Sequence, residues 1–452
     1  MTVCELTTNA TADLGADTLA FPSLPAILSK DELTGPQAPA NLEDAGVGPQ
    51  VLQDLAMKLA YTVPSLTTAW AADQLCLPLQ LTEQIYWGLK NDKLVEVTGQ
   101  QGHFNYTYTA TQRGRDHAGR LFEICGYVGP APVSLESYSA MLQWQFTRWP
   151  RVTMDKVQRA LSQLVFPEAT YQVAALAVSS GRSLFLFGPA GNGKTSMGRA
   201  LHKALQGELW IPHCLHVGNS IIRVFDSQCH ELIESSPGQG PGRLDRRWLR
   251  VRRPLIVAGG EMTIDELDLI YSPSMRFYEA PPHVKANGGT FLIDDLGRQR
   301  VKPQELLNRW IIPLEHGFDH LVLNTGQKIQ IPFQQMLVVA TNLTVTDVAD
   351  PAFLRRMGYR LHLDMPGPQD YAKIFQRYAA SVGVEPSSEL MSWLLERYRS
   401  EERELRASEP RDLIQRARDI CLLHDRPFEL AADVMELAWL GYFGNGIGHQ
   451  PG

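Results

Sequence analysis

The stretch Gly188-Pro189-Ala190-Gly191-Asn192-Gly193-Lys194-Thr195-Ser196 decides the fold class of this chain. It follows a short apolar run, Ser183–Phe187, and precedes a helical pattern, Met197–Leu205. Between a strand and a helix, the pattern G-x-x-x-x-G-K-[ST] indicates a phosphate-binding loop, because backbone N–H groups and the helix N-terminus converge on phosphate oxygens. Lys194 would reach the β- and γ-phosphates, and Thr195 would ligate Mg²⁺. The sequence therefore predicts ATP or GTP binding; the alternative is a chance match in a glycine-rich turn.

The composition is that of a globular protein with several domains. A chain of 452 residues is long enough for two to four domains, and its net charge of −7 gives no general attraction to polyanions. No apolar stretch has the length of a membrane span, and the chain does not open with a signal sequence. The six cysteines are scattered without a C-x-x-C pair, which favours reduced thiols over disulfides or a zinc site. These features predict a cytoplasmic protein without a membrane span.

The N-terminal third divides into a leader and a small domain. Residues 1–45 lack sustained periodicity and are expected to form a flexible leader with a short helix near Ile27–Leu33. Residues 46–125 show three helical patterns followed by two strand patterns, which resembles a winged-helix domain. The candidate recognition helix, Leu79–Lys93, has few basic residues, and phosphate contacts dominate DNA affinity. Protein docking or oligomer assembly is therefore favoured over DNA binding, which stays open.

The rest of the chain is expected to form an ATPase core with additions. A Gly/Pro-rich linker with one amphipathic helix covers residues 126–151, the core covers 152–365, and a helical lid covers 366–452. The core contains a long insertion around residues 213–287. This insertion includes an arginine-rich stretch, Arg243–Arg253, for which a solvated or subunit-facing surface and a nucleic-acid contact both remain open.

Local patterns predict several elements inside the core. Turn residues indicate hairpins within Cys214–Asp226 and Leu321–Ile331. Helical spacing indicates a helix over Pro303–Glu315, and Thr263-Ile264-Asp265-Glu266 has the form of a capping box that opens another helix.

A second motif completes the predicted phosphate site. Gly288–Asp295 is an apolar strand that ends in two carboxylates, Asp294 and Asp295. The first carboxylate would hold Mg²⁺ through water, and the second would orient and polarise the attacking water. Aspartate at the second position is shorter than the commoner glutamate.

In this order, the motifs from about Val152 to Gly444 resemble those of an AAA+ ATPase. The chain looks most like the subgroup with a helix-2 insertion and a pre-sensor hairpin, which includes MoxR-type chaperones, magnesium chelatase subunits and bacterial enhancer-binding activators. Phe277–Asp295 is similar to the activators' F-x-x-A-x-G-G-T-L-F-L-D-E, and Ala340-Thr341-Asn342-Leu343 to their sensor strand. The resemblance implies a P-loop α/β fold, a parallel sheet sandwiched by helices, with a C-terminal helical lid and, here, an N-terminal winged-helix (α+β) domain.

The resemblance also implies roles for single residues. Asn342 corresponds to sensor 1, which positions water with Asp295, and Arg411 corresponds to the sensor-2 arginine of the lid. Arg356, or its neighbour Arg355, corresponds to an arginine finger that enters the next subunit's site. ATP and Mg²⁺ are the implied ligands, and a homo-oligomeric ring, a hexamer by family default, is the implied assembly.

The expected function is ATP-driven remodelling of a protein client by such a ring. The activators' G-A-F-T-G-A signature is absent, and Gly259–Arg276 occupies the place of a substrate-engaging loop. Met262, Tyr271 and Phe277 are candidate client contacts, although core packing is the favoured interpretation for each of them. A DNA-associated regulator that uses the winged helix and a nucleotide-sensing switch with little turnover are the competing hypotheses.

Overall fold

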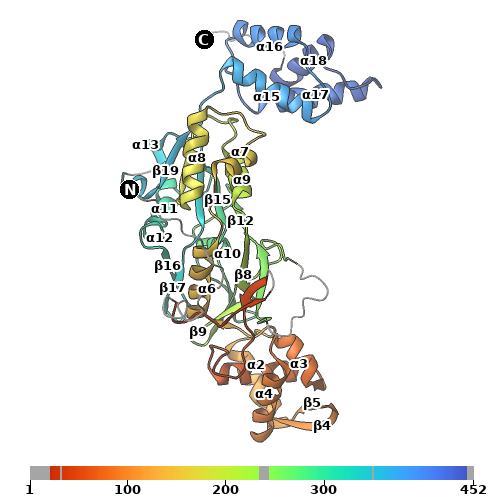
Figure 1. Ribbon diagram of the computed structural model, residues 1–452, viewed down its shortest axis with the longest axis vertical. Coiled ribbons are helices and arrows are strands. Elements are labelled where there is room, and N and C mark those ends of the chain that lie inside the picture. Colours follow the sequence, from red (N-terminus) through yellow and green to blue (C-terminus); the bar gives the residue numbers. More distant parts are fainter. Residues whose placement is uncertain (1–20, 31–32, 234–243, 349–350, 445–452) are drawn as a thin grey trace, which may run out of the picture.

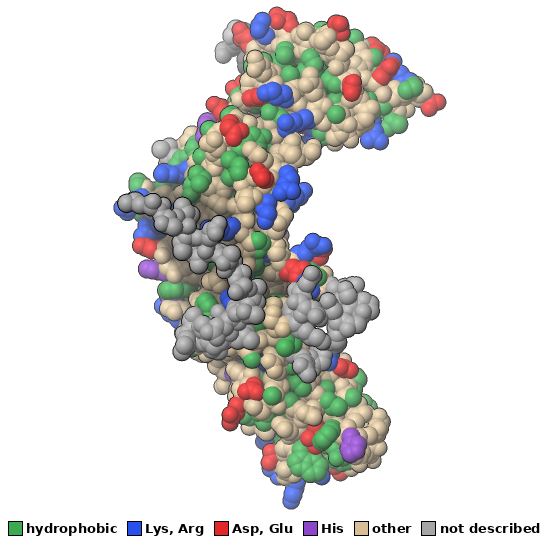
Figure 2. Space-filling view, viewed as in Figure 1, with side chains coloured by type: hydrophobic (Ala, Val, Ile, Leu, Met, Phe, Trp, Pro, Cys, Tyr) green, Lys and Arg blue, Asp and Glu red, His purple; other side chains and the backbone are tan. Residues whose placement is uncertain are grey.

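The computed structural model describes residues 21–30, 33–233, 244–348 and 351–444. The chain forms an elongated column with the C-terminal helices at one end and the N-terminal domain at the other (Figure 1). In the same orientation, one side of the column has a concave outline between these two ends (Figure 2). Within the described residues, no helix combines the length and the apolar character needed to span a bilayer.

The core domain is built on a five-stranded parallel sheet. Its strand order is β12 (Leu255–Ala258), β15 (Thr290–Leu296), β18 (Met336–Thr341), β7 (Leu184–Phe187) and β19 (Tyr359–His362). All six residues of β18 are buried, as expected for a central parallel strand that is covered on both faces.

Helices cover both faces of this sheet. One face packs against α7 (Met154–Ala160), α8 (Glu168–Ser180) and α9 (Lys194–Ala204). The other packs against α11 (Pro303–Asn308), α12 (Ile311–His316) and α14 (Pro351–Arg356). The expected α/β class, with a helix-covered parallel sheet, is confirmed.

The lid is a separate bundle with its own core, and the expected four helices are confirmed. They are α15 (Pro368–Ser381), α16 (Ser388–Ser400), α17 (Glu409–Leu423) and α18 (Ala432–Phe443). At their centre the Tyr371 and Tyr398 hydroxyls lie 2.9 Å apart, and Tyr398 donates to the buried Glu409 carboxylate at 2.7 Å. This core fixes the helices to one another and makes the lid a rigid unit.

The N-terminal domain has the three helices and the hairpin that the sequence predicted. Its elements, in order, are α2 (Pro49–Thr62), β3 (Leu66–Thr67), α3 (Thr68–Leu75), α4 (Leu79–Asn91), β4 (Val95–Gly102), β5 (Asn105–Ala110) and α5 (Gln112–Ile124). The strands form one sheet in the order β3-β5-β4, and the helices pack over it around Tyr86 and Tyr108.

A middle domain, formed by segments that are distant in sequence, lies between the N-terminal domain and the core (Figure 1). It combines the linker helix α6 (Leu135–Arg148) with three groups of strands around one apolar core. The first group is a five-stranded sheet in the order β13 (Ile270–Ser272), β14 (Phe277–Glu279), β10 (Ser220–Arg223), β9 (Cys214–Val217) and β6 (Val133–Ser134). The others are the pairs β8 (Glu208–Pro212) with β11 (Trp248–Arg252), and β16 (Phe318–Val322) with β17 (Lys328–Pro332). The predicted hairpins β9–β10 and β16–β17 are confirmed.

Three predicted helices are wrong or altered. The described residues of Ile27–Leu33 are not helical: β1 (Ile27–Lys30) and β2 (Leu33–Pro36) pair as antiparallel strands, and the Trp210 indole donates to Thr34 O. The capping box at Thr263 opens only a 3₁₀ turn, Asp265–Leu267, because Leu267 is buried and β13 follows at once. The helix over Pro303–Glu315 divides into α11 and α12, since Pro313 has no N–H to donate to the carbonyl of Arg309.

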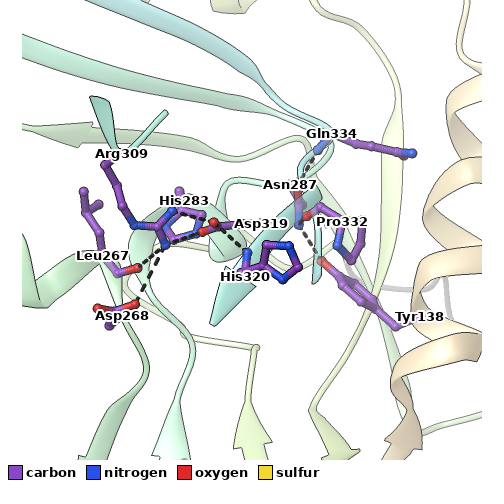
Figure 3. Close-up of polar contacts among 10 residues, drawn as sticks. All are labelled: Tyr138, Leu267, Asp268, His283, Asn287, Arg309, Asp319, His320, Pro332 and Gln334. Atoms are coloured by element: carbon purple, nitrogen blue, oxygen red, sulfur yellow. Dashed lines mark hydrogen bonds and ion pairs between the residues drawn. The ribbon is translucent and has the colours of Figure 1, made fainter. Parts of the chain in front are cut away.

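A buried ionic network fixes the base of hairpin β16–β17 (Figure 3). Asp319, 1% exposed, accepts from both terminal nitrogens of Arg309 at 2.5 and 2.6 Å and from the backbone N–H of His320 at 2.8 Å. His283 Nε2 lies 2.9 Å from the same carboxylate. Arg309 also contacts Asp268, at 3.8 Å. One carboxylate therefore ties the hairpin to α10 (Pro282–Lys285) and to the junction of α11 and α12.

Candidate functional site

The predicted phosphate loop connects the interior strand β7 to helix α9. Gly188, Gly191 and Gly193 have φ values of +132°, +84° and +80°. A Cβ atom at Gly188 would lie 2.3 Å from Leu363 O, and one at Gly191 would lie 2.8 Å from Ser408 Oγ in the lid. Glycine is therefore required for both the backbone conformation and the close packing.

Lys194 lies across the phosphate loop. Its ammonium donates to Gly188 O at 2.8 Å and to Pro189 O at 2.7 Å. Burial lowers the pKa of Lys194, while the nearby Asp295 and Asp294 oppose this shift. Both hydrogen bonds of the Lys194 ammonium go to neutral carbonyl groups. Because the ammonium is partly desolvated, an anionic ligand would stabilise its charge.

Asn192 is 2% exposed, and its side-chain nitrogen and oxygen have no hydrogen-bond partner among the described residues. Buried amides are almost always hydrogen-bonded, so an orphaned one in a glycine loop points to a ligand or bound water. This observation, together with the glycine conformations, fits a loop made for a polyphosphate.

The acidic strand end lies beside the phosphate loop. The register between β15 and β18 shifts between Ile293 and Leu296, and Asp295 has φ +50°. Bulges near active sites re-aim side chains, and left-handed backbone at a non-glycine residue is uncommon. Here the bulge allows two consecutive carboxylates to face the same cleft.

The two residues predicted to hold the metal are in direct contact. Thr195 Oγ1 donates to Asp294 Oδ1 at 2.8 Å. Mg²⁺ prefers oxygen ligands and usually keeps several waters. Thr195 Oγ1 could therefore ligate Mg²⁺ directly while Asp294 accepts from one of its waters, with phosphate supplying other ligands. No group of three His, Cys, Asp or Glu side chains in the described part of the chain could hold a metal by itself.

Asp295 and Asn342 are the predicted water-positioning pair. Asn342 follows β18, and its Nδ2 donates to Asp295 Oδ1 at 3.2 Å. The other carboxylate oxygen lies 3.6 Å from the Arg298 guanidinium, which also borders the cleft. The strand order explains this contact, because the carboxyl ends of adjacent parallel strands meet at one edge of the sheet.

These residues line one cleft of about 640 Å³ between the core and the lid. Its walls include the loop from Ala190 to Ser196, both aspartates and Asn342, together with Arg411 of the lid. Arg411 pairs with its neighbour Asp412 at 3.1 Å.

The two predicted finger arginines do not line this cleft. The Arg356 guanidinium is 2.6 Å from Glu315 and donates to Ala352 O at 2.8 Å. Arg355 is exposed and has no hydrogen bond or ion pair with any other described residue. Of the two, Arg355 is the one available to a neighbouring subunit.

Several cleft residues were missed by the sequence motifs. The segment Gln163–Phe166 forms one wall, and Ile374, Arg377 and Tyr378 of α15 face it. Arg377 donates to Ser162 O and Leu164 O, both at 2.9 Å, and so joins the lid to the core. Because Arg377 is more than 200 residues from Ser162 and Leu164, no local sequence motif could predict these hydrogen bonds.

Gln299 was also missed, although it braces the acidic strand end. This buried amide donates to Gly259 O at 3.1 Å and to Asp294 O at 3.2 Å, and accepts from Gly297 N at 2.8 Å. It therefore links the ends of β12 and β15 behind the two carboxylates. Its position four residues after the second aspartate was the only available signal.

Two of the three candidate client contacts are core residues. Met262 and Phe277 are 1% and 7% exposed, so the favoured core interpretation is confirmed for both and neither is available to a client. Tyr271 is half-buried, with its ring centroid 4.9 Å from that of Tyr278. The following turn supports the N-terminal domain instead, since Met275 O accepts from Gly126 N at 2.9 Å.

The described arginines of the arginine-rich stretch are mostly paired with carboxylates. Of its members, Arg243 lies outside the described residues. Four others pair with carboxylates: Arg246 with Asp73, Arg247 with Asp245, Arg250 with Glu208, and Arg252 with Glu231. The Arg247–Asp245 pair is fully buried. The stretch is therefore mainly a structural element that holds the middle domain together.

Comparisons with known proteins identify the lid but no family for the whole chain. Residues 367–440 match a family described as a domain of unknown function, DUF8689. No curated protein matches the chain.

The chain is similar to solved structures of low identity. Thermotoga maritima RuvB, a Holliday junction branch migration motor, is 14% identical, with 62% of this chain and 70% of that chain covered at a TM-score of 0.36. NtrX from Brucella abortus in complex with ADP is 13% identical, with 66% and 60% covered at a TM-score of 0.38. The chain's own elements carry the assignment: the P-loop, the acidic and polar strand ends and the helical lid surround one cleft. The chain therefore has a P-loop α/β fold with a C-terminal helical lid.

Proposed function

We propose that this chain is a cytoplasmic, Mg²⁺-dependent ATP hydrolase that assembles into a ring and remodels a protein client. The observation that carries the hydrolase proposal is the arrangement of four side chains at one end of the sheet. Thr195 contacts Asp294, and Asn342 contacts Asp295, at the mouth of the phosphate loop. These are the groups that phosphoryl transfer to water needs: metal ligands beside the phosphates, and a carboxylate and an amide beside the attacking water.

Each residue has a distinct task in this proposal. The loop N–H groups and Lys194 bind the phosphates, which replace the carbonyls of Gly188 and Pro189 as partners of the ammonium. Mg²⁺, when bound, neutralises charge on the phosphates, and Thr195 and Asp294 would hold it. Asp295 accepts a proton from the attacking water, which Asn342 orients.

The backbone at Asp295 compensates for the short side chain. Aspartate reaches one methylene less far than glutamate. The bulge and the left-handed conformation at Asp295 turn its carboxylate toward the cleft. Strain of this kind costs about 1–3 kcal/mol and persists where the surrounding structure supports it, as Gln299 does here.

Ring assembly would supply the missing arginine. Arg355 is exposed at the end of α14 and does not line its own cleft, so we assign it as the finger that enters a neighbour's site. A finger supplied in trans contributes about 10³–10⁵ in rate. A hexamer is the assembly that the family resemblance suggests.

A protein client is favoured over DNA for two reasons. The arginines between Arg246 and Arg252 are paired with carboxylates and therefore offer little attraction to phosphates. The N-terminal domain also exposes large aromatic side chains, Trp70, Trp87 and Phe104, which suit protein docking.

The scattered cysteines, of which five are described and none is in a disulfide, agree with a reducing compartment.

The test of hydrolysis is Asp295→Asn, with ATP binding and steady-state turnover measured in parallel. Asparagine retains the shape but cannot take a proton, so turnover should fall by at least about 100-fold with ATP affinity changed less than about threefold. Glu305→Gln, an exposed carboxylate on α11, serves as the control. Normal turnover by Asp295→Asn would refute the assignment.

The ring is tested separately by mass photometry of Asp295→Asn with and without ATP-Mg²⁺. A discrete ring that requires nucleotide supports the proposal, and the same sample can then trap a client. A monomer under both conditions would contradict the ring and favour a nucleotide-sensing switch.

A further inference from the structure

A second pocket lies at the far end of the P-loop helix. It has a volume of about 540 Å³ and shares no residue with the nucleotide cleft. His202 and Lys203, at the C-terminal end of α9, form one side, and Arg252 and Arg253 form the other. Since α9 has eleven residues, the pocket lies about 16 Å from the phosphate loop.

Arg253 is the one described arginine of its stretch without a carboxylate partner. Its Nε donates to Gly288 O at 2.5 Å, and its guanidinium lies 4.0 Å from the centroid of the Trp149 ring. A terminal nitrogen reaches Gln206 O at 3.5 Å. Burial lowers the pKa of Arg253 to about 10, which still leaves it charged at neutral pH. Aromatic stacking and a backbone contact thus fix a cation whose charge is not neutralised.

The charges around Arg253 are unbalanced. Lys203 is exposed and pairs with no carboxylate in the described part of the chain, and Arg252 pairs with Glu231, the one acidic residue of the pocket lining. Three cations therefore face one carboxylate. His202 adds no charge at neutral pH, because burial lowers its pKa to about 4 and it contacts Thr290 Oγ1 at 3.0 Å.

The geometry points to a phosphate-binding site in this pocket, with the Arg253 guanidinium as the fixed donor and Lys203 as the mobile one. A pre-oriented guanidinium presents paired N–H groups that match a phosphate, and it is less hydrated than an ammonium. The ligand class is a small phosphate-bearing molecule, either inorganic phosphate or a phosphate monoester. This inference does not depend on hydrolysis in the nucleotide cleft.

The test is equilibrium binding of inorganic phosphate and of glycerol phosphate to the full chain carrying Lys194→Ala, which disables the phosphate loop. We expect saturable binding to one site. Arg253→Ala should weaken it by about 10–100-fold, the effect of losing hydrogen bonds to a charged group. Arg253→Lys should weaken it less, because the charge remains while the fork is lost. Binding of inorganic phosphate alone would identify the free ion as the ligand, and tighter binding of glycerol phosphate would identify a monoester.

If Arg253→Ala does not fold, Lys203→Ala serves as the second variant. Lys203 is exposed, so its replacement should not disturb the fold. It should weaken binding by about threefold to tenfold. Lys328→Ala, an exposed lysine of β17, should leave binding unchanged. The inference is overturned if neither probe binds saturably, or if binding is the same with and without Arg253 and Lys203.

Discussion

Replacement of Asp319 by asparagine would test how the β16–β17 hairpin is held on the core. The Asp319 carboxylate is buried against the Arg309 guanidinium and His283 (Figure 3). Asparagine has nearly the same shape but leaves the Arg309 charge without its main counterion. Removal of one partner from a buried ion pair costs about 3–5 kcal/mol. Arg309 is 20% exposed and Asp268 lies 3.8 Å from it, so we expect a somewhat smaller cost than this range, about 2–4 kcal/mol.

The assay is native-state hydrogen exchange, because local opening free energies can be measured without assuming that a multi-domain chain unfolds in one step. Peptides that cover β16 and β17 should lose about 2–4 kcal/mol of opening free energy. His320→Ala, an exposed neighbour on the same strand, should change it by less than about 0.5 kcal/mol. A loss below about 1 kcal/mol for Asp319→Asn, or an equal loss for His320→Ala, would refute the reasoning.

Three further predictions concern the catalytic geometry and the pH dependence. Gln299→Leu removes three buried hydrogen bonds behind the two aspartates. ATP turnover should therefore fall roughly tenfold while ATP affinity changes less than about threefold. Equal losses of turnover and of affinity would contradict a positioning role. Arg355→Ala should reduce turnover by about 10³-fold or more, and Arg356→Ala, which breaks a contact within its own subunit, should reduce it less; the reverse order would assign the finger to Arg356. His202 has its pKa lowered to about 4, so the unfolded chain binds a proton that the folded chain excludes, and stability should be lost as the pH falls from 6.5 to 4. Native-state hydrogen exchange of peptides that cover α9, followed across this pH range, should show a pH dependence of the opening free energy smaller by close to one proton for His202→Gln, whereas exposed His424→Gln should leave it unchanged.

The sequence was sufficient for the parts of the fold and site whose chemistry is local. The glycine loop needs positive φ values at fixed positions, and a strand that ends in Asp294 and Asp295 brings carboxylates to the same sheet edge. Asn342 could be located because β18 lies beside β15. Short motifs with strict backbone requirements can be predicted in this way.

The middle domain could not be predicted, because its contacts join segments far apart in the chain. Helix α6, the strands around residue 215 and hairpin β16–β17 bury a shared core, and none of them carries a pattern that names its partner. For the same reason, the charges of Arg246 and Arg250 resemble a surface patch until Asp73 and Glu208 are placed beside them. Burial decides between the two interpretations of Met262 and Phe277 in favour of the core, which their apolar residue types alone favour without deciding.

The most direct test of the central claim is isothermal titration of the full chain with ATP-Mg²⁺, compared with Lys194→Ala. The structure predicts one site per chain in the wild type, formed by the phosphate loop, the two aspartates and the lid. Loss of the Lys194 ammonium should weaken binding by at least about tenfold, since charge-assisted contacts to phosphate contribute about 1.5–3 kcal/mol. Equal affinity of the two proteins, or no binding by either, would contradict the assignment of this cleft as the nucleotide site.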